Sequence, residues 1–316
     1  MDYISGWCKS ERRLQGMTSI VTGSNTGIGR ETALDLYLRG CRVIMACRDM
    51  NKATKAKTEM ETLHEKTEGK GILVVQKLDV SSLRSVREFA ALILAEEPEI
   101  DILVNNAGVM TVPQGISEDG FEIHMATNHF GHALLTFMLL PKLAKSSNAR
   151  VVFVSSRMHE SKNLDLEDIN FERTPYDPLC AYSRSKVANI LFARALSRRL
   201  KEHNIDKIST YSLHPGVIGT AIGRHFSESV LRGTTWIFDN VLYWFVKSPR
   251  CGAQTTIYCA VDDQCAAQSG LYYSDCAVQS PSKYAQNDKV ADEFWKLTLE
   301  ALKLNESDLF NLGTQS

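Results

Sequence analysis

The sequence predicts a single α/β domain built on a doubly wound, mostly parallel sheet of seven strands with helices on both faces. The first observation is a short β-branched run, Ile20–Thr22, that leads through several glycines into a segment of helical length ending at Gly40. The second is the alternation of strand-like and helical stretches along the chain. The third is the length of 316 residues, which suits one large α/β domain or two small ones.

Composition excludes several classes of protein. With 44% hydrophobic residues, 23% charged residues and a net charge of -1, the chain is ordinary for a globular protein, and we expect no nucleic-acid partner. The eight cysteines include no Cys-x-x-Cys pair, so we expect no metal site and no thioredoxin-type redox centre. Residues 1–15 form an N-terminal extension without the apolar core of a signal peptide, which favours a cytoplasmic location.

The glycines between the first strand and the first helix predict a phosphate-binding turn. Such a junction gathers free N–H groups and the positive end of a helix dipole, and a Cβ there would block the approach of a pyrophosphate. The spacing is Gly-x-x-x-Gly-x-Gly rather than Gly-x-Gly-x-x-Gly, and glycine clusters also mark ordinary turns. The expected cofactor contacts in this turn are Gly23, Ser24, Asn25, Thr26, Gly27, Ile28 and Gly29.

The end of the second strand, over residues 42–46, predicts which dinucleotide binds. Arg48 stands where the adenosine ribose arrives, and an arginine there accommodates the 2′-phosphate of NADP(H), whereas an acidic residue would hold the 2′-hydroxyl of NAD. A second cation, Arg30, follows the glycine turn. We therefore expect NADP(H). The alternatives are a solvated arginine at a strand end, or a preference reversed by the adjacent Asp49.

The remaining elements follow in order. We expect helices over 51–66, 82–97, 121–145 and 180–196, strands over 72–78, 100–104, 150–156, 208–213 and 270–273, and irregular stretches over 112–120 and 157–179. The third strand ends in Asp79 and Val80. The fourth ends in Asn105–Gly108, whose carboxamides and small residues suit a position beside the cofactor ribose and tie neighbouring strands together.

The helix over 121–145 carries Asn128 near its middle, with His129 and His132 close by. An isolated helix asparagine such as Asn128 is usually a surface residue. His129 and His132 share its face, but a histidine pair with no third ligand nearby favours packing over metal binding.

An acid–base pair is predicted on the helix over 180–196. Tyr182 and Lys186 are four residues apart, so they share one face. A free phenol titrates near pH 10, and a neighbouring ammonium would pull its pKa toward neutrality, as a general acid–base requires. Ser156 ends the preceding strand, where its hydroxyl could hold a carbonyl or alcohol oxygen beside Tyr182. The alternative is a surface Tyr–Lys pair that occurs by chance.

These motifs resemble, in kind and order, those of the short-chain dehydrogenase/reductase family. They are Thr22–Gly29, Asn105–Gly108, Asn128, Ser156, Tyr182 with Lys186, and Pro215–Gly216. Within the family the chain is most similar to the retinol dehydrogenase group, through residues 23–33, 45–49, 78–82 and 128–132. The step of 26 residues from Ser156 to Tyr182 (182 − 156), about twice the common gap of the family, also resembles that group.

The resemblance implies a role for each matching residue. Tyr182 would be the acid–base, Lys186 would lower its pKa and bond the nicotinamide ribose, and Ser156 would orient the substrate. Asn128 would anchor a water-linked proton path. Further cofactor contacts are implied at Arg48, Asp79, Val80, Asn106, Ala107, Gly108, Tyr182, Lys186, Pro215, Gly216, Val217 and Thr220, with Thr220 on the nicotinamide carboxamide.

The chain departs from the family in two places. Phe153 stands where many members have asparagine, and we expect no N-terminal membrane helix of the kind that several retinol dehydrogenases carry.

The resemblance also places a substrate lid over residues 221–250. Its 230–247 part is rich in aromatic and aliphatic residues, but Asp239 and Asn240 interrupt it, so it cannot span a bilayer. Such side chains suit a long apolar substrate, such as a retinoid or a lipid aldehyde. They would also suit contact with a membrane surface, or packing against protein alone.

The leading functional hypothesis is an NADP(H)-dependent enzyme that interconverts retinol and retinal. The alternatives are a carbonyl reductase for steroids or lipid-derived aldehydes, and a non-catalytic NADP(H)-binding sensor, which would not need the intact acid–base set. A sugar-nucleotide epimerase is disfavoured, because those relatives usually carry a longer C-terminal domain. The apolar helix over 187–196 could pair in a homodimer or pack on its own sheet.

Overall fold

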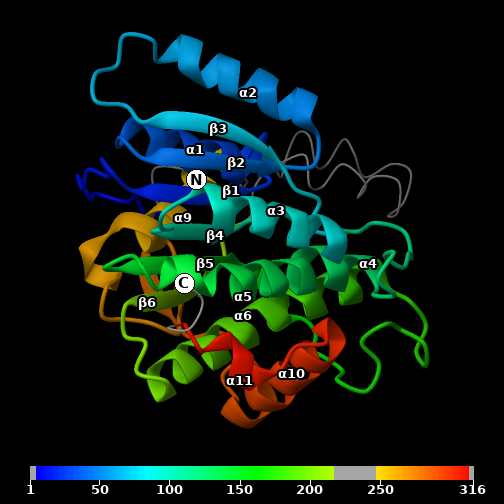
Figure 1. Ribbon diagram of the computed structural model, residues 1–316. Coiled ribbons are helices and arrows are strands. Elements are labelled where there is room, and N and C mark those ends of the chain that lie inside the picture. The colour runs from blue at the N-terminus through cyan, green and yellow to red at the C-terminus, as the bar shows by residue number, and fades with distance from the viewer. Residues whose placement is uncertain (1–4, 217–246, 313–316) are drawn as a thin grey trace.

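The computed structural model describes residues 5–216 and 247–312, which form one α/β unit around a single sheet (Figure 1). The strand order is β3-β2-β1-β4-β5-β6-β7-β8, and every pairing is parallel except that of β7 with β8. The strands are β1 Thr18–Thr22, β2 Arg42–Cys47, β3 Ile72–Lys77, β4 Ile102–Asn105, β5 Ala149–Val154, β6 Ile208–Leu213, β7 Leu271–Ser274 and β8 Ala277–Gln279. The predicted fold class is confirmed.

The sheet has one strand more than the seven predicted. The additional strand, β8, is three exposed residues long and closes a hairpin on β7. It lacks the alternation of apolar and polar residues by which a half-buried strand is recognised.

Helices cover both faces of the sheet, as a doubly wound fold requires. On one face lie α1 Gly27–Leu38, α2 Met50–Leu63 and α9 Pro249–Val261 (Figure 1). On the other face lie α3 Leu83–Glu96, α5 Gly131–Leu143 and α6 Pro178–Glu202. The helix α10 Asp288–Leu302 packs on α6. Neighbouring strand residues contribute to opposite cores, as Ile20 and Val21 of β1 do. The apolar stretch over 187–196 lies in the core beneath α10, so it packs on its own sheet.

The helix predicted over 121–145 is divided into three parts. These are α4 Ile123–Met125, a π-helical turn η1 Ala126–Phe130, and α5. A π turn is a local insertion into an α-helix and often marks a functional position. Periodicity alone does not detect it, because the apolar pattern continues on both sides.

Three further short elements complete the described chain. The irregular stretch after β5 contains a 3₁₀ turn, η2 Arg157–Glu160, and η5 Asp263–Cys265 and α11 Glu306–Leu309 are similarly short. The sequence prediction did not assign these or the longer helices α9 and α10.

The order of the strands reverses between β1 and β4, and this switch point positions the site. On one side of it the chain builds outward through β2 and β3, and on the other through β5 and β6. The crossover helices leave in opposite directions there, so a crevice opens at the carboxyl ends of the central strands.

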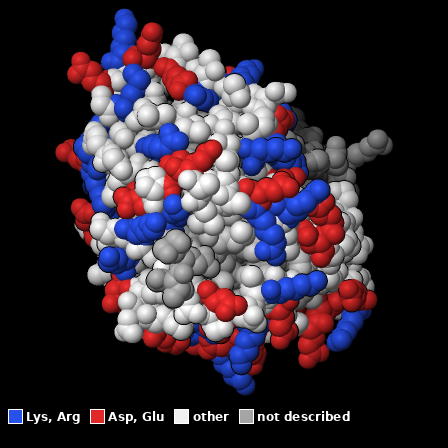
Figure 2. Space-filling view, viewed as in Figure 1, with Lys and Arg blue, Asp and Glu red and all other residues white. Residues whose placement is uncertain are grey.

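The surface carries both signs of charge. Figure 2 shows Lys and Arg side chains interspersed with Asp and Glu over the face of the molecule that it displays, without a large field of either sign.

Among residues 5–216 and 247–312, no helix combines the length and apolar character needed to cross a bilayer.

Candidate active site

A cavity of about 1080 Å³ lies at the carboxyl ends of the central strands. The predicted site residues that line it are Gly23, Asn25, Thr26, Gly27, Ile28, Gly29, Arg48, Asp79, Val80, Asn106, Ala107, Gly108, Ser156, Tyr182, Lys186, Pro215 and Gly216. Ser24 and Asn128 are fully buried behind its wall. Val217, Thr220 and most of the predicted lid, including nearly all of the 230–247 segment, lie outside the described residues.

The glycine turn has the close-packed backbone that a pyrophosphate site needs. Gly23 and Gly27 adopt positive φ angles of 66° and 58°, in the left-handed region that favours glycine. A Cβ built on Gly29 would lie 2.6 Å from the carbonyl oxygen of Gly23, so no larger residue fits. Thr26 precedes α1 in an extended conformation, and its side chain caps no N–H of the helix. The first turn of α1 therefore presents its amides to the cavity, and the turn fits a dinucleotide phosphate.

Thr22 joins the glycine turn to the end of β4. Its hydroxyl oxygen accepts hydrogen bonds from the amides of Asn106 and Ala107, both at 2.9 Å. The Asn106 carboxamide donates in return to the Thr22 carbonyl at 2.8 Å. The prediction that carboxamides here tie neighbouring strands together is confirmed.

The end of β2 leaves Arg48 available to a ligand. Its side chain is 69% exposed, and its ion pair with Asp79 is long at 4.0 Å. The adjacent Asp49 is committed elsewhere, since its carboxylate caps α2 at the Lys52 amide (3.0 Å) and pairs with the Lys52 ammonium (3.1 Å). Those bonds lower the pKa of Asp49. Lys55, which the sequence reasoning did not single out, also lines this end of the cavity.

The predicted acid–base set converges on the same cavity. Tyr182 and Lys186 face it from adjacent turns of α6, with the Lys186 ammonium 5.6 Å from the centroid of the Tyr182 ring. The Lys186 ammonium donates to the Val154 carbonyl at 3.0 Å. Ser156 hydrogen-bonds to the Tyr182 phenol through its side chain. The surface-pair alternative is therefore wrong, because both side chains of α6 are buried.

The pKa of Tyr182 does not shift in the direction expected from the sequence. Burial raises the pKa of the phenol, and the hydrogen bond from Ser156 opposes that rise only in part. The ammonium of Lys186 lies over the ring and bonds to Val154, and its own burial lowers the pKa of Lys186 to about 8. In the protein without a cofactor, the loss of hydration therefore affects the pKa of Tyr182 more than the nearby Lys186 ammonium does. Tyr182 is accordingly a neutral, protonated phenol.

Asn128 hydrogen-bonds the backbone of Val109, a residue that lines the cavity. Its side-chain oxygen accepts from the Val109 amide at 2.8 Å, and its side-chain nitrogen donates to the Val109 carbonyl at 3.0 Å and to the Ser185 hydroxyl at 2.9 Å. The residue lies in the π turn and is fully buried, so the surface alternative is wrong. No signal in the sequence identified Val109 as its partner.

His129 and His132 belong to the core, as expected. His129 lies 3.3 Å from both Asn189 and Thr298, while His132 bridges the Thr22 hydroxyl (2.9 Å) and the Asn128 carbonyl (3.2 Å). Burial lowers the pKa of His129 to about 3 and that of His132 to about 4, so both are neutral at pH 7. The described residues contain no group of three or more side chains suited to a metal ion.

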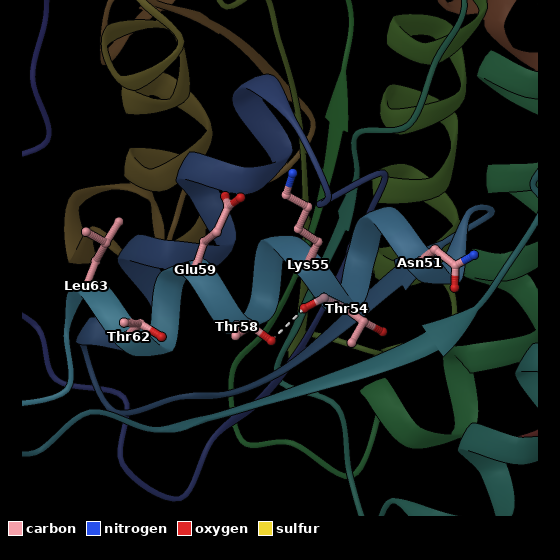
Figure 3. A pocket seen from close by; sticks show the side chains of 7 residues that line it. All are labelled: Asn51, Thr54, Lys55, Thr58, Glu59, Thr62 and Leu63. Atoms are coloured by element: carbon pink, nitrogen blue, oxygen red, sulfur yellow. Dashed lines mark hydrogen bonds between the residues drawn. The ribbon is translucent and has the colours of Figure 1, made fainter.

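A second hollow, of about 750 Å³, lies along α2 (Figure 3). It is lined only by that helix, through Asn51, Thr54, Lys55, Thr58, Glu59, Thr62 and Leu63. A single helix cannot enclose a ligand, and the Thr58 hydroxyl is satisfied by the Thr54 carbonyl at 3.1 Å. The candidate active site is therefore the cavity at the strand ends.

Comparison with known proteins agrees with this geometry. The sequence profile of the short chain dehydrogenase family matches residues 17–230. Human retinol dehydrogenase 11 is 42% identical over 300 residues, covering 95% of this chain and 90% of that protein. Human retinol dehydrogenase 13 is 40% identical, covering 98% and 93%.

Solved structures share the fold. An uncharacterized protein from Mycobacterium paratuberculosis is 32% identical with a TM-score of 0.74, over 95% of this chain and 99% of that one. The NADP complex of RhlG from Pseudomonas aeruginosa is 22% identical with a TM-score of 0.64, over 86% and 98% of the two chains.

Proposed function

Because this chain belongs to the short-chain dehydrogenase family and resembles its retinol dehydrogenases, we propose that it is an NADP(H)-dependent oxidoreductase that interconverts a lipophilic alcohol and its carbonyl, with retinol and retinal as the leading pair. One observation carries the proposal. Tyr182, Ser156 and Lys186 line the same cavity as the glycine turn and Arg48. A hydride carrier and a proton donor would therefore meet in one space.

The mechanism divides between cofactor and protein. A bound nicotinamide supplies or accepts the hydride. Tyr182, kept protonated by burial, is suited to give its proton to the oxygen of a carbonyl substrate, and the phenolate takes a proton back in the opposite direction. The Ser156 hydroxyl, bonded to that phenol, orients the substrate oxygen. Lys186 places a cation beside the ring, and Asn128 fixes the wall of the site through Val109.

Arg48 supports the choice of NADP(H) over NAD(H). Its exposed guanidinium lines the cavity, and a 2′-phosphate is a better partner for it than a carboxylate 4.0 Å away. The carboxylate of Asp49 is bound to Lys52 in the first turn of α2. Asp49 is therefore not free to hold the ribose of NAD(H) and to reverse the preference for NADP(H). The residues that would hold the cofactor are the glycine turn, Arg48, Lys186 and, from the sequence, Thr220.

The choice of substrate rests on the relatives and on apolar side chains. The relatives are named retinol dehydrogenases, and Val109, Met110 and Met158 line the cavity. We further propose that the enzyme is cytoplasmic and that its 230–247 segment contacts a membrane surface. Flotation with liposomes tests the last point, and a protein found wholly in the soluble fraction would contradict it.

A carbonyl panel tests the function. Retinal, medium-chain aldehydes and a steroid ketone are supplied with NADPH and, separately, with NADH, and turnover is followed by nicotinamide absorbance. We expect turnover of retinal with NADPH, at a higher kcat/KM than with NADH. Turnover only of steroids or short aldehydes would replace the substrate class. NADPH binding without turnover of any carbonyl would indicate a sensor.

A further inference from the structure

A strip of backbone, Val109–Val112, lines the cavity beside Tyr182 and is held at both ends. At the near end, Asn128 bonds both the amide and the carbonyl of Val109. At the far end, the amide of Val112 donates to Nε2 of His124 at 3.4 Å, and the carbonyl of Val112 accepts from the Tyr176 hydroxyl at 3.3 Å. Val109 and Met110 contribute to the cavity lining between these two attachments.

Thr111 shows that the strip is constrained. It has a positive φ of 49° and is almost fully buried. A β-branched residue adopts this left-handed conformation only when its surroundings impose it. The two attachments therefore determine where the strip lies.

A clasp of three side chains, the buried Glu122 and His124 and the partly buried Tyr176, makes the far attachment. Because Nε2 of His124 accepts from Val112, its Nδ1 carries the proton and donates to Glu122 at 2.7 Å. The Glu122 carboxylate also accepts from the amides of His124 (3.0 Å) and Met125 (2.8 Å). Its Oε1 lies 3.2 Å from the Tyr176 hydroxyl, whose single proton it shares with the Val112 carbonyl. Three N–H donors and the shared hydroxyl proton thus satisfy the Glu122 carboxylate, which is 1% exposed and would otherwise be strongly disfavoured by burial.

The clasp joins the long segment between Ser156 and Tyr182 to the wall of the site. Tyr176 comes from that segment, and Asn170 reinforces the junction by accepting from the Glu122 amide at 2.9 Å and donating to the Gly120 carbonyl at 3.1 Å. The same segment is anchored to α6 through Arg184, which donates to the Asp168 carbonyl at 3.0 Å.

The clasp also lies next to the reacting group. The His124 ring approaches the Tyr182 ring edge-on, with 6.3 Å between their centroids. The strip, the clasp and the acid–base are therefore in one packed unit.

We propose that Glu122, His124 and Tyr176 are positioning residues for substrate selection: by fixing Val109–Val112, they set the apolar wall against which the body of the substrate lies while its oxygen meets Tyr182. The proposal rests on the proposed oxidoreductase function. The gap between Ser156 and Tyr182 is longer than the common gap of the family, and the reaction itself does not require the extra residues. The proposal gives these residues a role in substrate selection. A small carbonyl makes little contact with such a wall, whereas a long apolar one depends on it.

The test is Tyr176→Phe, which keeps the ring and its packing on Phe171 but removes the hydroxyl. The matched control is Tyr258→Phe on α9, which removes a hydroxyl that donates to the Gln264 side chain. Both variants and the unaltered protein are assayed with straight-chain aldehydes of increasing length and with retinal. We expect Tyr176→Phe to raise KM for the long substrates about threefold to tenfold, the range that loss of one hydrogen bond allows. KM for short aldehydes, kcat and the Kd for NADPH should stay within about twofold.

Two outcomes of this assay would overturn the proposal. One is an equal rise in KM for every chain length, because a general structural defect would act in that way. The other is an unchanged KM throughout.

Hydrogen exchange separates failure of the clasp from failure of the proposed function. With NADPH bound, Tyr176→Phe should exchange faster at the amides of 109–116 than the unaltered protein, and Tyr258→Phe should not. If the unaltered protein turns over no carbonyl, the function fails, and exchange still decides whether the clasp holds the strip. Unchanged exchange at 109–116 would overturn the clasp whether or not the enzyme is active.

Discussion

The two ends of the cavity are built differently. At the catalytic end, Lys186 and Asn128 are buried, and each is hydrogen-bonded to backbone. At the end where Arg48 lies, the side chains are exposed and the ion pairs are long or lie within one turn of a helix. Buried polar groups keep one position, whereas exposed charges adapt and are screened by salt. Substitutions at the first end should therefore change rate and stability, and those at the second should change the choice of ligand.

The largest expected effect is at the catalytic end. Tyr182→Phe removes the proton donor and leaves the ring, so we expect kcat to fall about 100-fold to 10,000-fold, the contribution typical of general acid–base catalysis. The Kd for NADPH, measured by fluorescence titration, should change by less than about twofold. If the variant kept substantial turnover, the catalytic end would not have the role assigned to it.

The two core histidines that follow Asn128 should make the protein sensitive to acid. Because burial lowers the pKa of His129 to about 3 and of His132 to about 4, below the value near 6.5 in an unfolded chain, protons bind the unfolded state first as pH falls. Stability is therefore complete near pH 7 and decreases through the window from about pH 6.5 toward pH 4. Each histidine should account for about 2 kcal/mol of that loss between pH 7 and pH 5.

Urea denaturation at the two pH values measures this loss. His129→Gln cannot be protonated there, so its free energy of unfolding should fall less between pH 7 and pH 5 than that of the unaltered protein. The control His203→Gln alters an exposed histidine and should leave the difference as it is. Equal losses in all three proteins would show that the buried histidines do not produce the acid sensitivity.

The smallest effect belongs to the exposed end. Arg48→Glu replaces a cation with an anion where the 2′-phosphate is expected, so the preference for NADPH over NADH should fall about tenfold or more, with kcat nearly unchanged. In the unaltered protein the Kd for NADPH should rise with salt, because exposed charges are screened. A preference unaffected by Arg48→Glu would remove the charge-based account of cofactor choice.

The same division explains what could be predicted from sequence. The glycine turn, Arg48 and the Tyr182–Lys186 pair are local patterns, in which spacing along one strand end or helix face determines neighbourhood. The strands β1 to β7 are likewise predicted from short, largely apolar runs, because strands covered on both faces are nearly continuous in hydrophobic residues. Most residues predicted from these patterns line the cavity.

The contacts that sequence reasoning missed are long-range. Asn128 contacts Val109 because a π turn redirects it, and Tyr176 reaches Val112 across 64 residues. Neither partner can be read from periodicity. The pKa of Tyr182 was misjudged for a related reason: spacing placed Lys186 nearby but could not show how deeply the phenol is buried.

Isotope effects in a single turnover test the central claim most directly. Excess enzyme is mixed with retinal and either NADPH or its C4-deuterated form, in H₂O and in D₂O, and NADPH oxidation is followed. If Tyr182 gives its proton as the hydride transfers, deuterium on the cofactor and deuterium in the solvent should each slow the reaction. A cofactor effect with no solvent effect would contradict that role of Tyr182.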